Sequence, residues 1–269
     1  MQKRIENDLN NIQPESELSN ARSPYCSFEL PTGFLDKNET DASGNYKVIK
    51  DIELREITGD EEDMLAAKGM NSNQRINNLM VGCLVRVGKY TEKNKIREIV
   101  LELVSNDRFF VVYKIREISL GKEYRFKAPC PHCSDDKLRI VDLSEVKFPS
   151  LKDPQKRIYE GVLPKSQINY KWAVQTGKTE EKLQKVLQAA SNNLFSALIA
   201  QRLVELGGRP SSIQDVKKLV ALDRQHLRKE FEEVEGLLDD NITVDCPVCG
   251  NEFDVEVDIG HKEFFFPTA

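Results

Sequence analysis

Four cysteines are the residues in this 269-residue chain with the clearest capacity for chemistry. They form two pairs of the same spacing, Cys130-Pro131-His132-Cys133 and Cys246-Pro247-Val248-Cys249. Two intervening residues let the backbone turn tightly, so both sulfurs of a pair can face one ion, and structural zinc sites commonly gather four thiolates in this way. Proline stiffens each turn, and Gly250 permits a positive φ after the second pair. The spacing predicts one structural Zn²⁺ per chain, bound by Cys130, Cys133, Cys246 and Cys249.

A second chemistry is open to the same thiols. Cys-Pro-His-Cys is the active-site tetrapeptide of oxidising thioredoxin-fold enzymes, in which a helix following the first cysteine lowers its pKa. The residues after Cys133 alternate between polar and apolar, which indicates a strand, and no thioredoxin βαβ pattern surrounds them. Zinc is therefore favoured, with a thiol redox protein as an alternative. We expect His132 to be exposed and not required as a ligand.

Other catalytic constellations are sparse. The chain has three histidines, His132, His226 and His261, and lacks a G-x-S-x-G motif, a Walker loop and an H-E-x-x-H motif. A closed four-cysteine site leaves no coordination position for a substrate. The sequence therefore predicts that the protein is not an enzyme.

The cysteine pairs end two copies of a longer pattern. Cys246 follows Cys130 by 116 residues, and several landmarks between them recur at offsets of 116 to 118. Thr58 and Thr176 each precede an acidic segment typical of a helix start, and Thr58 and Glu61 have capping-box spacing. The other paired landmarks are alternating strands at 52–54 and 168–174, apolar helical stripes at 76–87 and 194–206, and the helix-opening pairs Asp107-Arg108 and Asp223-Arg224.

This pattern predicts an α+β fold of two tandem pseudo-symmetric repeats. Each repeat would contain a strand, about three helices and a two-stranded Cys-Pro-Xaa-Cys knuckle, and a pseudo-twofold arrangement would join the knuckles around one zinc. The expected organisation is a mobile N-terminal arm at 1–46, repeat 1 at 47–149, a linker at 150–165 and repeat 2 at 166–269. The arm is expected from its polar composition.

Composition and charge argue against several classes of function. The formal net charge is −5 and the isoelectric point is about 5.5, which argues against a nucleic-acid partner. A zinc-ribbon nucleic-acid adaptor remains an alternative because Arg125, Lys127, Lys137 and Arg139 crowd the first cysteine pair. No apolar run of about 18 residues predicts a membrane span, and the N-terminal residues do not resemble a secretory signal. We interpret Cys83 as a small core residue.

An ordered set of short motifs resembles one known family. The motifs are Glu29-Leu30-Pro31-Thr32-Gly33, the segment 54–62, Asn106-Asp107-Arg108, Ile115-Arg116 with Ser119-Leu120-Gly121, and Cys130-Pro131-His132-Cys133 before Val141-Asp142-Leu143. Together they are similar to the baseplate-hub and tail-assembly proteins of contractile-tailed bacteriophages and related injection systems. The resemblance covers residues 28–148 directly and the remainder through the repeat.

The resemblance implies a non-enzymatic structural or assembly role in the baseplate hub. The partners would be other phage tail or hub proteins, with no membrane, no small-molecule substrate and no nucleic acid. The protein would reside in the host cytoplasm, with incorporation into the virion tail as a further option. No family residue roles are carried over, and the four cysteines rest on their own chemistry.

Overall fold

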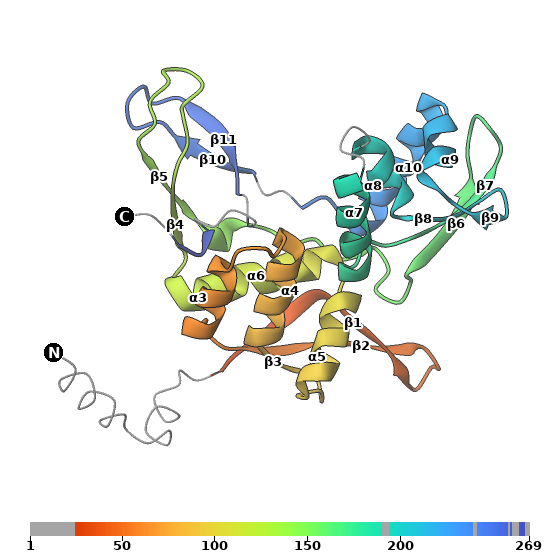
Figure 1. Ribbon diagram of the computed structural model, residues 1–269, viewed down its shortest axis with the longest axis horizontal. Helices are drawn as coiled ribbons and strands as arrows, with labels where there is room; N and C mark the ends of the chain where they lie inside the picture. Colours follow the sequence, from red (N-terminus) through yellow and green to blue (C-terminus); the bar gives the residue numbers. More distant parts are fainter. Residues whose placement is uncertain (1–24, 190–193, 239–240, 258, 260–263, 267–269) are drawn as a thin grey trace.

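The computed structural model describes residues 25–189, 194–238, 241–257, 259 and 264–266. Over these residues the chain is a mixed α/β protein with eight α-helices and several antiparallel sheets. Figure 1 shows two halves side by side, the first containing β1 to β5 and the second containing β6 to β9. None of the helices in the described ranges is both long and apolar enough to cross a bilayer.

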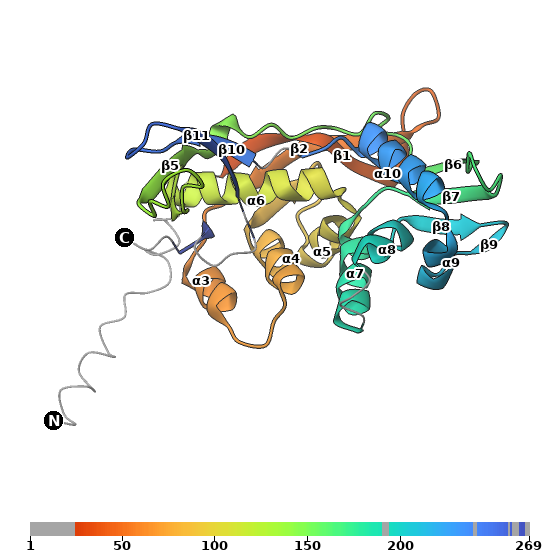
Figure 2. The ribbon, with the colours of Figure 1, turned by 90° about the horizontal axis from the view of Figure 1, so that it is seen from above.

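The first half is built on the three-stranded antiparallel sheet β1-β2-β3. Helices α4, α5 and α6 all lie on one side of β1 and β2 in Figure 2. Buried residues such as Leu30, Ile52, Leu79 and Ile115 form the core between sheet and helices. The elements of this half are β1 Cys26–Thr40, β2 Tyr46–Leu54, α3 Gly59–Ala66, α4 Ser72–Cys83, β3 Leu84–Val87, α5 Lys93–Glu102 and α6 Ser105–Leu120.

The second half is built on the four-stranded antiparallel sheet β6-β7-β8-β9. Its own core gathers around the buried Trp172, which lies against Phe231 of α10 with ring centroids 4.6 Å apart. The elements are β6 Ile158–Val162, β7 Asn169–Ala173, α7 Gly177–Ala189, α8 Leu194–Ala200, β8 Leu203–Leu206, β9 Arg209–Pro210, α9 Ile213–Lys218 and α10 Ala221–Glu235.

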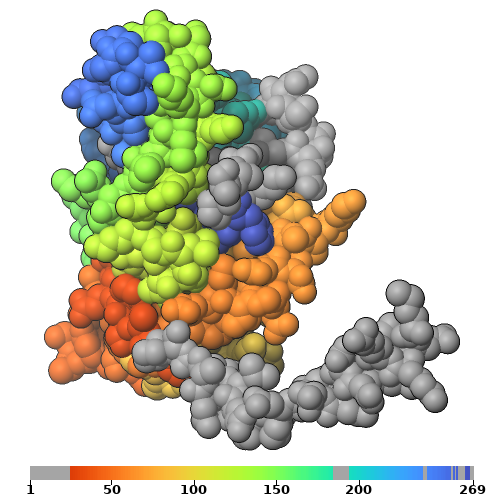
Figure 3. Space-filling model, turned by 90° about the vertical axis from the view of Figure 1, so that its left-hand side faces the viewer, coloured from red at the N-terminus to blue at the C-terminus, as the bar shows by residue number. Residues whose placement is uncertain are grey.

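A two-stranded hairpin follows the last helix of each half. The first cysteine hairpin pairs β4 (Glu123–Lys127) with β5 (Leu138–Asp142), and a short 3-10 turn at Leu143–Glu145 follows it. The second cysteine hairpin pairs β10 (Asn241–Asp245) with β11 (Glu252–Glu256). Although it follows α10, the second hairpin lies beside the first (Figures 1 and 3), and Ile242 and Val244 belong to the first half's core. The chain therefore returns to its first half before it ends.

Local sequence features place the helix starts correctly. Thr58 is the N-cap of α3, and the Glu61 carboxylate accepts hydrogen bonds from the Thr58 N–H at 3.0 Å and the Thr58 hydroxyl at 2.8 Å. Helix α7 begins at Gly177, directly after Thr176. The predicted strands at 52–54 and 168–174 are confirmed within β2 and β7, and Asp107 and Asp223 both lie in the first turn of a helix. Cys83 is buried, as predicted.

The mobile-arm prediction is wrong for the part of it that the structure describes beyond residue 25. Residues 26–40 form β1, which pairs along β2 from Cys26 opposite Leu54 to Thr40 opposite Tyr46. Leu30 and Phe34 of this strand are buried in the core of the first half, so apolar burial as well as backbone pairing with β2 stabilises it. Residues 1–24 lie outside the described residues. The linker prediction is also wrong at Ile158–Val162, which forms β6.

Both predicted apolar helices are too long. Helix α4 ends at Cys83 and the chain continues as β3, while α8 ends at Ala200 and is followed by β8. The apolar residues continue across each boundary, so periodicity alone does not mark where helix gives way to strand. Helices α5 and α9 add a fourth helix to each half, where about three were expected.

Candidate metal centre

The four predicted cysteines meet at the tips of the two cysteine hairpins. The Sγ atoms of Cys130 and Cys249 lie 3.8 Å apart, and those of Cys133 and Cys246 lie 3.6 Å apart. All four sulfurs lie within 4.8 Å of one another. Within the described part of the chain, this is the one group of three or more His, Cys, Asp or Glu ligand atoms close enough to share an ion.

These distances suit a tetrahedral metal. Zinc–thiolate bonds are about 2.3 Å long, which places adjacent sulfurs of a tetrahedron about 3.8 Å apart. The closest sulfur pairs each join one hairpin to the other, so an ion between them would bind two segments that are more than a hundred residues apart in sequence. The donor set is compatible with a structural metal ion.

The backbone forms the same turn at both hairpin tips. In the first, the Cys130 N–H donates to the Asp135 carbonyl and the Ser134 N–H donates to the Cys130 carbonyl, each at 2.8 Å. In the second, the Cys246 N–H donates to the Asn251 carbonyl at 3.0 Å and the Gly250 N–H to the Cys246 carbonyl at 2.8 Å. The residue after each second cysteine has a positive φ, 60° at Ser134 and 71° at Gly250. The expectation for Gly250 is confirmed, and serine adopts the same conformation in the first turn.

Hydrogen-bond donors lie close to the sulfurs. The His132 N–H lies 3.4 Å from the Cys130 Sγ, and the Asn251 side-chain amide lies 3.4 Å from the Cys249 Sγ. Backbone N–H groups of Cys249 and Val248 lower the pKa of the Cys246 thiol to about 6, against the opposing effect of burial. The Asp135 N–H favours the Cys133 thiolate, but burial and hydrogen bonds with the other three thiols raise the pKa of Cys133 to about 12. Because thiolates are the metal-binding form, metal binding here would release protons and would depend on pH.

Arg139 is the main feature of the site that its sequence position did not reveal. Its side chain is buried, and Nη2 donates to Asp135 Oδ2 at 2.9 Å and lies 4.0 Å from the Cys246 Sγ on the other hairpin. The guanidinium carbon also lies 5.6 Å from the centroid of the Phe253 ring. Its Nε and Nη1 atoms are buried and form no hydrogen bond within the described residues. The sequence suggested a surface cation suited to nucleic acid, whereas the structure places this cation inside, between the hairpins.

The helix that thiol redox chemistry requires is absent after Cys133. The chain forms β5 from Leu138 instead, as the alternation predicted. Cys130 and Cys246 are buried, and Cys133 and Cys249 are exposed.

The histidines lie outside the thiol cluster or on its rim. His132 is exposed at the first tip, and His226 instead contacts the Tyr170 hydroxyl at 3.1 Å in the second half. His261 lies outside the described residues.

Comparison with known families agrees with the resemblance found in the sequence. A family model described as T4 bacteriophage base plate protein matches residues 39–266. The match covers most of the chain and both cysteine hairpins, so the chain belongs to this family. It is a phage baseplate protein, which makes it a structural component of the tail. No curated protein and no solved structure matches the chain.

Proposed function

We propose that this protein is a metal-stabilised structural or assembly component of the baseplate hub in a contractile phage tail. It would act through contacts with other tail or hub proteins and would carry out no catalysis. Family membership supports the tail assignment, and the thiol cluster supports the structural metal. The protein would be made in the host cytoplasm and incorporated into the virion tail.

The observation that carries the metal proposal is the tetrahedral spacing of the four sulfurs. Arg139 adds support because its buried guanidinium pairs with Asp135 through Nη2 only, and its Nε and Nη1 atoms form no hydrogen bond among the described residues. A Zn²⁺ ion bound by four thiolates carries a net charge of −2, and that charge would lie beside this cation. We assign Cys130, Cys133, Cys246 and Cys249 as the ligands of one Zn²⁺ per chain.

An internal repeat would explain why the two cysteine pairs are so far apart. From β2 and β7 onward both halves have a strand, two helices, a strand, two helices and a cysteine hairpin, and the second half adds the two-residue strand β9 after β8. Asp107 accepts hydrogen bonds from the consecutive N–H groups of Thr32 and Gly33, and Asp223 does the same with Lys165 and Ser166. The aspartate therefore makes the same kind of contact at the start of α6 and at the start of α10.

Arg108 and Arg224, which follow these aspartates, also make equivalent contacts. Arg108 Nη1 donates to the Val100 carbonyl at 2.7 Å, and Arg224 Nη1 donates to the Val216 carbonyl at 3.1 Å. Each carbonyl lies eight residues upstream of its arginine. We therefore propose repeats at 47–149 and 166–269, with the strands β1 and β6 added in front of them.

Co-expression with the neighbouring hub proteins tests this function. The wild-type chain should co-purify with one of them and contain zinc, and Cys130→Ser/Cys246→Ser should lose both the metal and the partner. Val248→Ser is the matched control, because it changes an exposed residue of the same turn that is not a ligand. Partner binding that is unchanged in a metal-free double variant would contradict the structural role of the metal.

The two alternatives give different results. A nucleic-acid adaptor would shift DNA or RNA in a gel and lose the shift as salt increases. A thiol redox protein would show rapid alkylation of Cys130 with metal present, whereas a buried metal ligand would be protected.

A further inference from the structure

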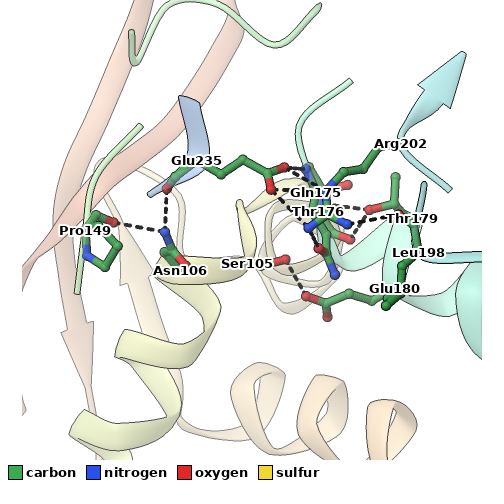
Figure 4. Close-up of polar contacts among 10 residues, drawn as sticks. All are labelled: Ser105, Asn106, Pro149, Gln175, Thr176, Thr179, Glu180, Leu198, Arg202 and Glu235. Carbon is green, nitrogen blue, oxygen red and sulfur yellow. Dashed lines mark hydrogen bonds and ion pairs between the residues drawn. The ribbon is translucent and has the colours of Figure 1, made fainter. Parts of the chain in front are cut away.

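The two halves join through the start of α6 and the start of α7. Val104 forms an antiparallel bridge with Thr176, and the Ser105 N–H donates to the Gln175 carbonyl at 3.1 Å. The Ser105 hydroxyl donates to the Glu180 carboxylate at 2.6 Å, as Figure 4 shows. Arg108 Nε forms an ion pair with the same carboxylate at 3.0 Å. This set of contacts is called the junction below.

A third contact brings α10 into the junction. The Asn106 side-chain amide donates to the Glu235 carbonyl at 2.7 Å and to the Pro149 carbonyl at 3.2 Å (Figure 4). The start of α6 is therefore covered by both the first and the last helix of the second half.

The equivalent surface of the second half is uncovered. Val104 is 3% exposed, and its counterpart Val220, 116 residues later, is 48% exposed. Asn106 is 9% exposed, and its counterpart Leu222 is 53% exposed. Helix α8, which packs against α10, adds the exposed side chains of Leu194 and Phe195. The second half thus presents an apolar surface where the first half has its junction.

Arg224 also differs from its counterpart in one respect. Arg108 contacts a carboxylate, whereas the described contacts of Arg224 are the Ser196 hydroxyl at 3.0 Å and the Val216 carbonyl. Among its described contacts, Arg224 therefore has no counterpart of the Glu180 carboxylate that pairs with Arg108.

The complementary surface is present at the other end of the chain. Thr58 and Glu62 precede Thr176 and Glu180 by 118 residues, so they are the first-half counterparts of the two residues of the second half that contact the start of α6 in the junction. Both are exposed, and among the described contacts the Glu62 carboxylate has no ion-pair partner. Helices α3 and α10, which follow Thr58 and Val220, lie toward opposite ends of the molecule in Figures 1 and 2.

We propose that a second copy of this chain docks here, head to tail, by repeating the junction between molecules. Val220 and Leu222 of one copy would pack against Ile57–Gly59 of the next, and Arg224 would pair with its Glu62. This inference rests on the proposed structural role and on the internal repeat. Because the two surfaces differ, the contact is heterologous and leads to a ring or an open chain of copies.

The contact should be weaker between molecules than within one. The covalent connection between the halves gives the internal junction a high effective concentration, which separate copies lack. An ion pair at the surface adds little, so most of the affinity would come from burying the exposed apolar side chains. Association should therefore depend on protein concentration.

Sedimentation velocity of the full-length protein across a concentration series tests the proposal. The wild type should form species larger than a monomer as concentration increases. Val220→Asp should shift the midpoint of association at least tenfold toward higher concentration, and Glu62→Arg should shift it in the same direction by a smaller factor, through repulsion of Arg224. Both change exposed residues, so the fold should be retained, and circular dichroism checks this. Glu145→Arg, at an exposed acidic residue outside both surfaces, is the matched charge control and should behave as the wild type does.

Charge exchange provides the most specific arm. Arg224→Glu should weaken association, and combining it with Glu62→Arg should recover at least part of the loss. A wild type that stays monomeric at every concentration overturns the inference, as does an assembly that Val220→Asp and Glu62→Arg leave unchanged. A monomeric chain that still binds zinc and co-purifies with hub proteins would overturn this inference alone and leave the proposed function in place.

Discussion

Replacing one cysteine of the proposed metal centre should destabilise the whole fold, because a bound ion would connect distant segments. Cys246→Ser removes the buried ligand of the second cysteine hairpin, which packs into the core of the first half. Cys246 lies 116 residues after Cys130. A cross-link that closes a loop of this length contributes about 5 kcal/mol in the chain-entropy model. For a chain of this size, that loss corresponds to a melting temperature lower by about 10–20 °C.

Thermal unfolding followed by circular dichroism measures this effect. The wild type should lose a comparable amount of stability in a strong chelator and recover it when zinc is restored. Cys246→Ser should melt near the temperature of the chelated wild type and respond little to chelator. Val248→Ser should match the wild type, since Val248 is exposed and is not a ligand. Equal melting temperatures for the wild type and Cys246→Ser, with no response to chelator, would refute the reasoning.

Three further predictions concern the surroundings of the site and the fold. Arg139→Met should speed the loss of zinc to a competing chelator and the alkylation of Cys246, because it removes the buried positive charge beside the thiolates. The rates for Arg139→Lys should lie between those of the wild type and Arg139→Met. Rates that neither variant changes would contradict this role. Asp223→Asn should lower the free energy of unfolding in urea by about 2 kcal/mol, since it disturbs the acceptor of the Lys165 and Ser166 N–H groups, and a change below about 0.5 kcal/mol would show those bonds to be dispensable. Burial opposes ionisation of Glu61, yet hydrogen bonds from Arg55 and Thr58 lower the pKa of its carboxyl to about 2, below the ordinary value of 4.5. Its stabilising contribution should therefore be full above pH 4.5 and lost as the pH falls toward 2, so the wild type should lose more stability over that range than Glu61→Gln, and parallel acid titrations would contradict the assignment.

The features predicted correctly depend on local chemistry. The cysteine spacing fixes a turn of four residues, and the expectation that two such turns share one ion predicted the cluster of four sulfurs without the path of the chain between them. The helix start at Thr58 was predictable because the capping partners, Thr58 and Glu61, lie within one turn of each other. Family membership followed from the order of the motifs.

The features that were missed depend on distant partners. Strand β1 is stabilised by pairing with β2 and by burial of Leu30 and Phe34 in the core of the first half, and the largely polar composition of residues 1–46 does not reveal these distant partners. Arg139 lies on an alternating strand next to other cations, and its burial results from a second hairpin that arrives from the far half. A stretch without polar side chains, 79–85, crosses from helix α4 into strand β3, so the position of β2 decides where the helix ends.

The pseudo-twofold arrangement was a reasonable prediction from two equivalent cysteine pairs, and the cysteine tips alone are compatible with it. The contacts between the halves do not follow such an axis, because Val104 is buried in the junction and Val220 is exposed. A twofold axis would bury Val104 and Val220 in equivalent contacts. The difference follows from the second cysteine hairpin, which crosses back to the first half after α10. The relative placement of two folded halves is not encoded in the periodicity of either.

X-ray absorption at the zinc edge, combined with metal analysis of the purified full-length protein, tests the central claim most directly. The account predicts one zinc per chain with four sulfur ligands at about 2.3 Å. Protein purified without metal that fails to take up one equivalent of zinc, or a bound zinc with nitrogen or oxygen ligands in place of a cysteine sulfur, would contradict it.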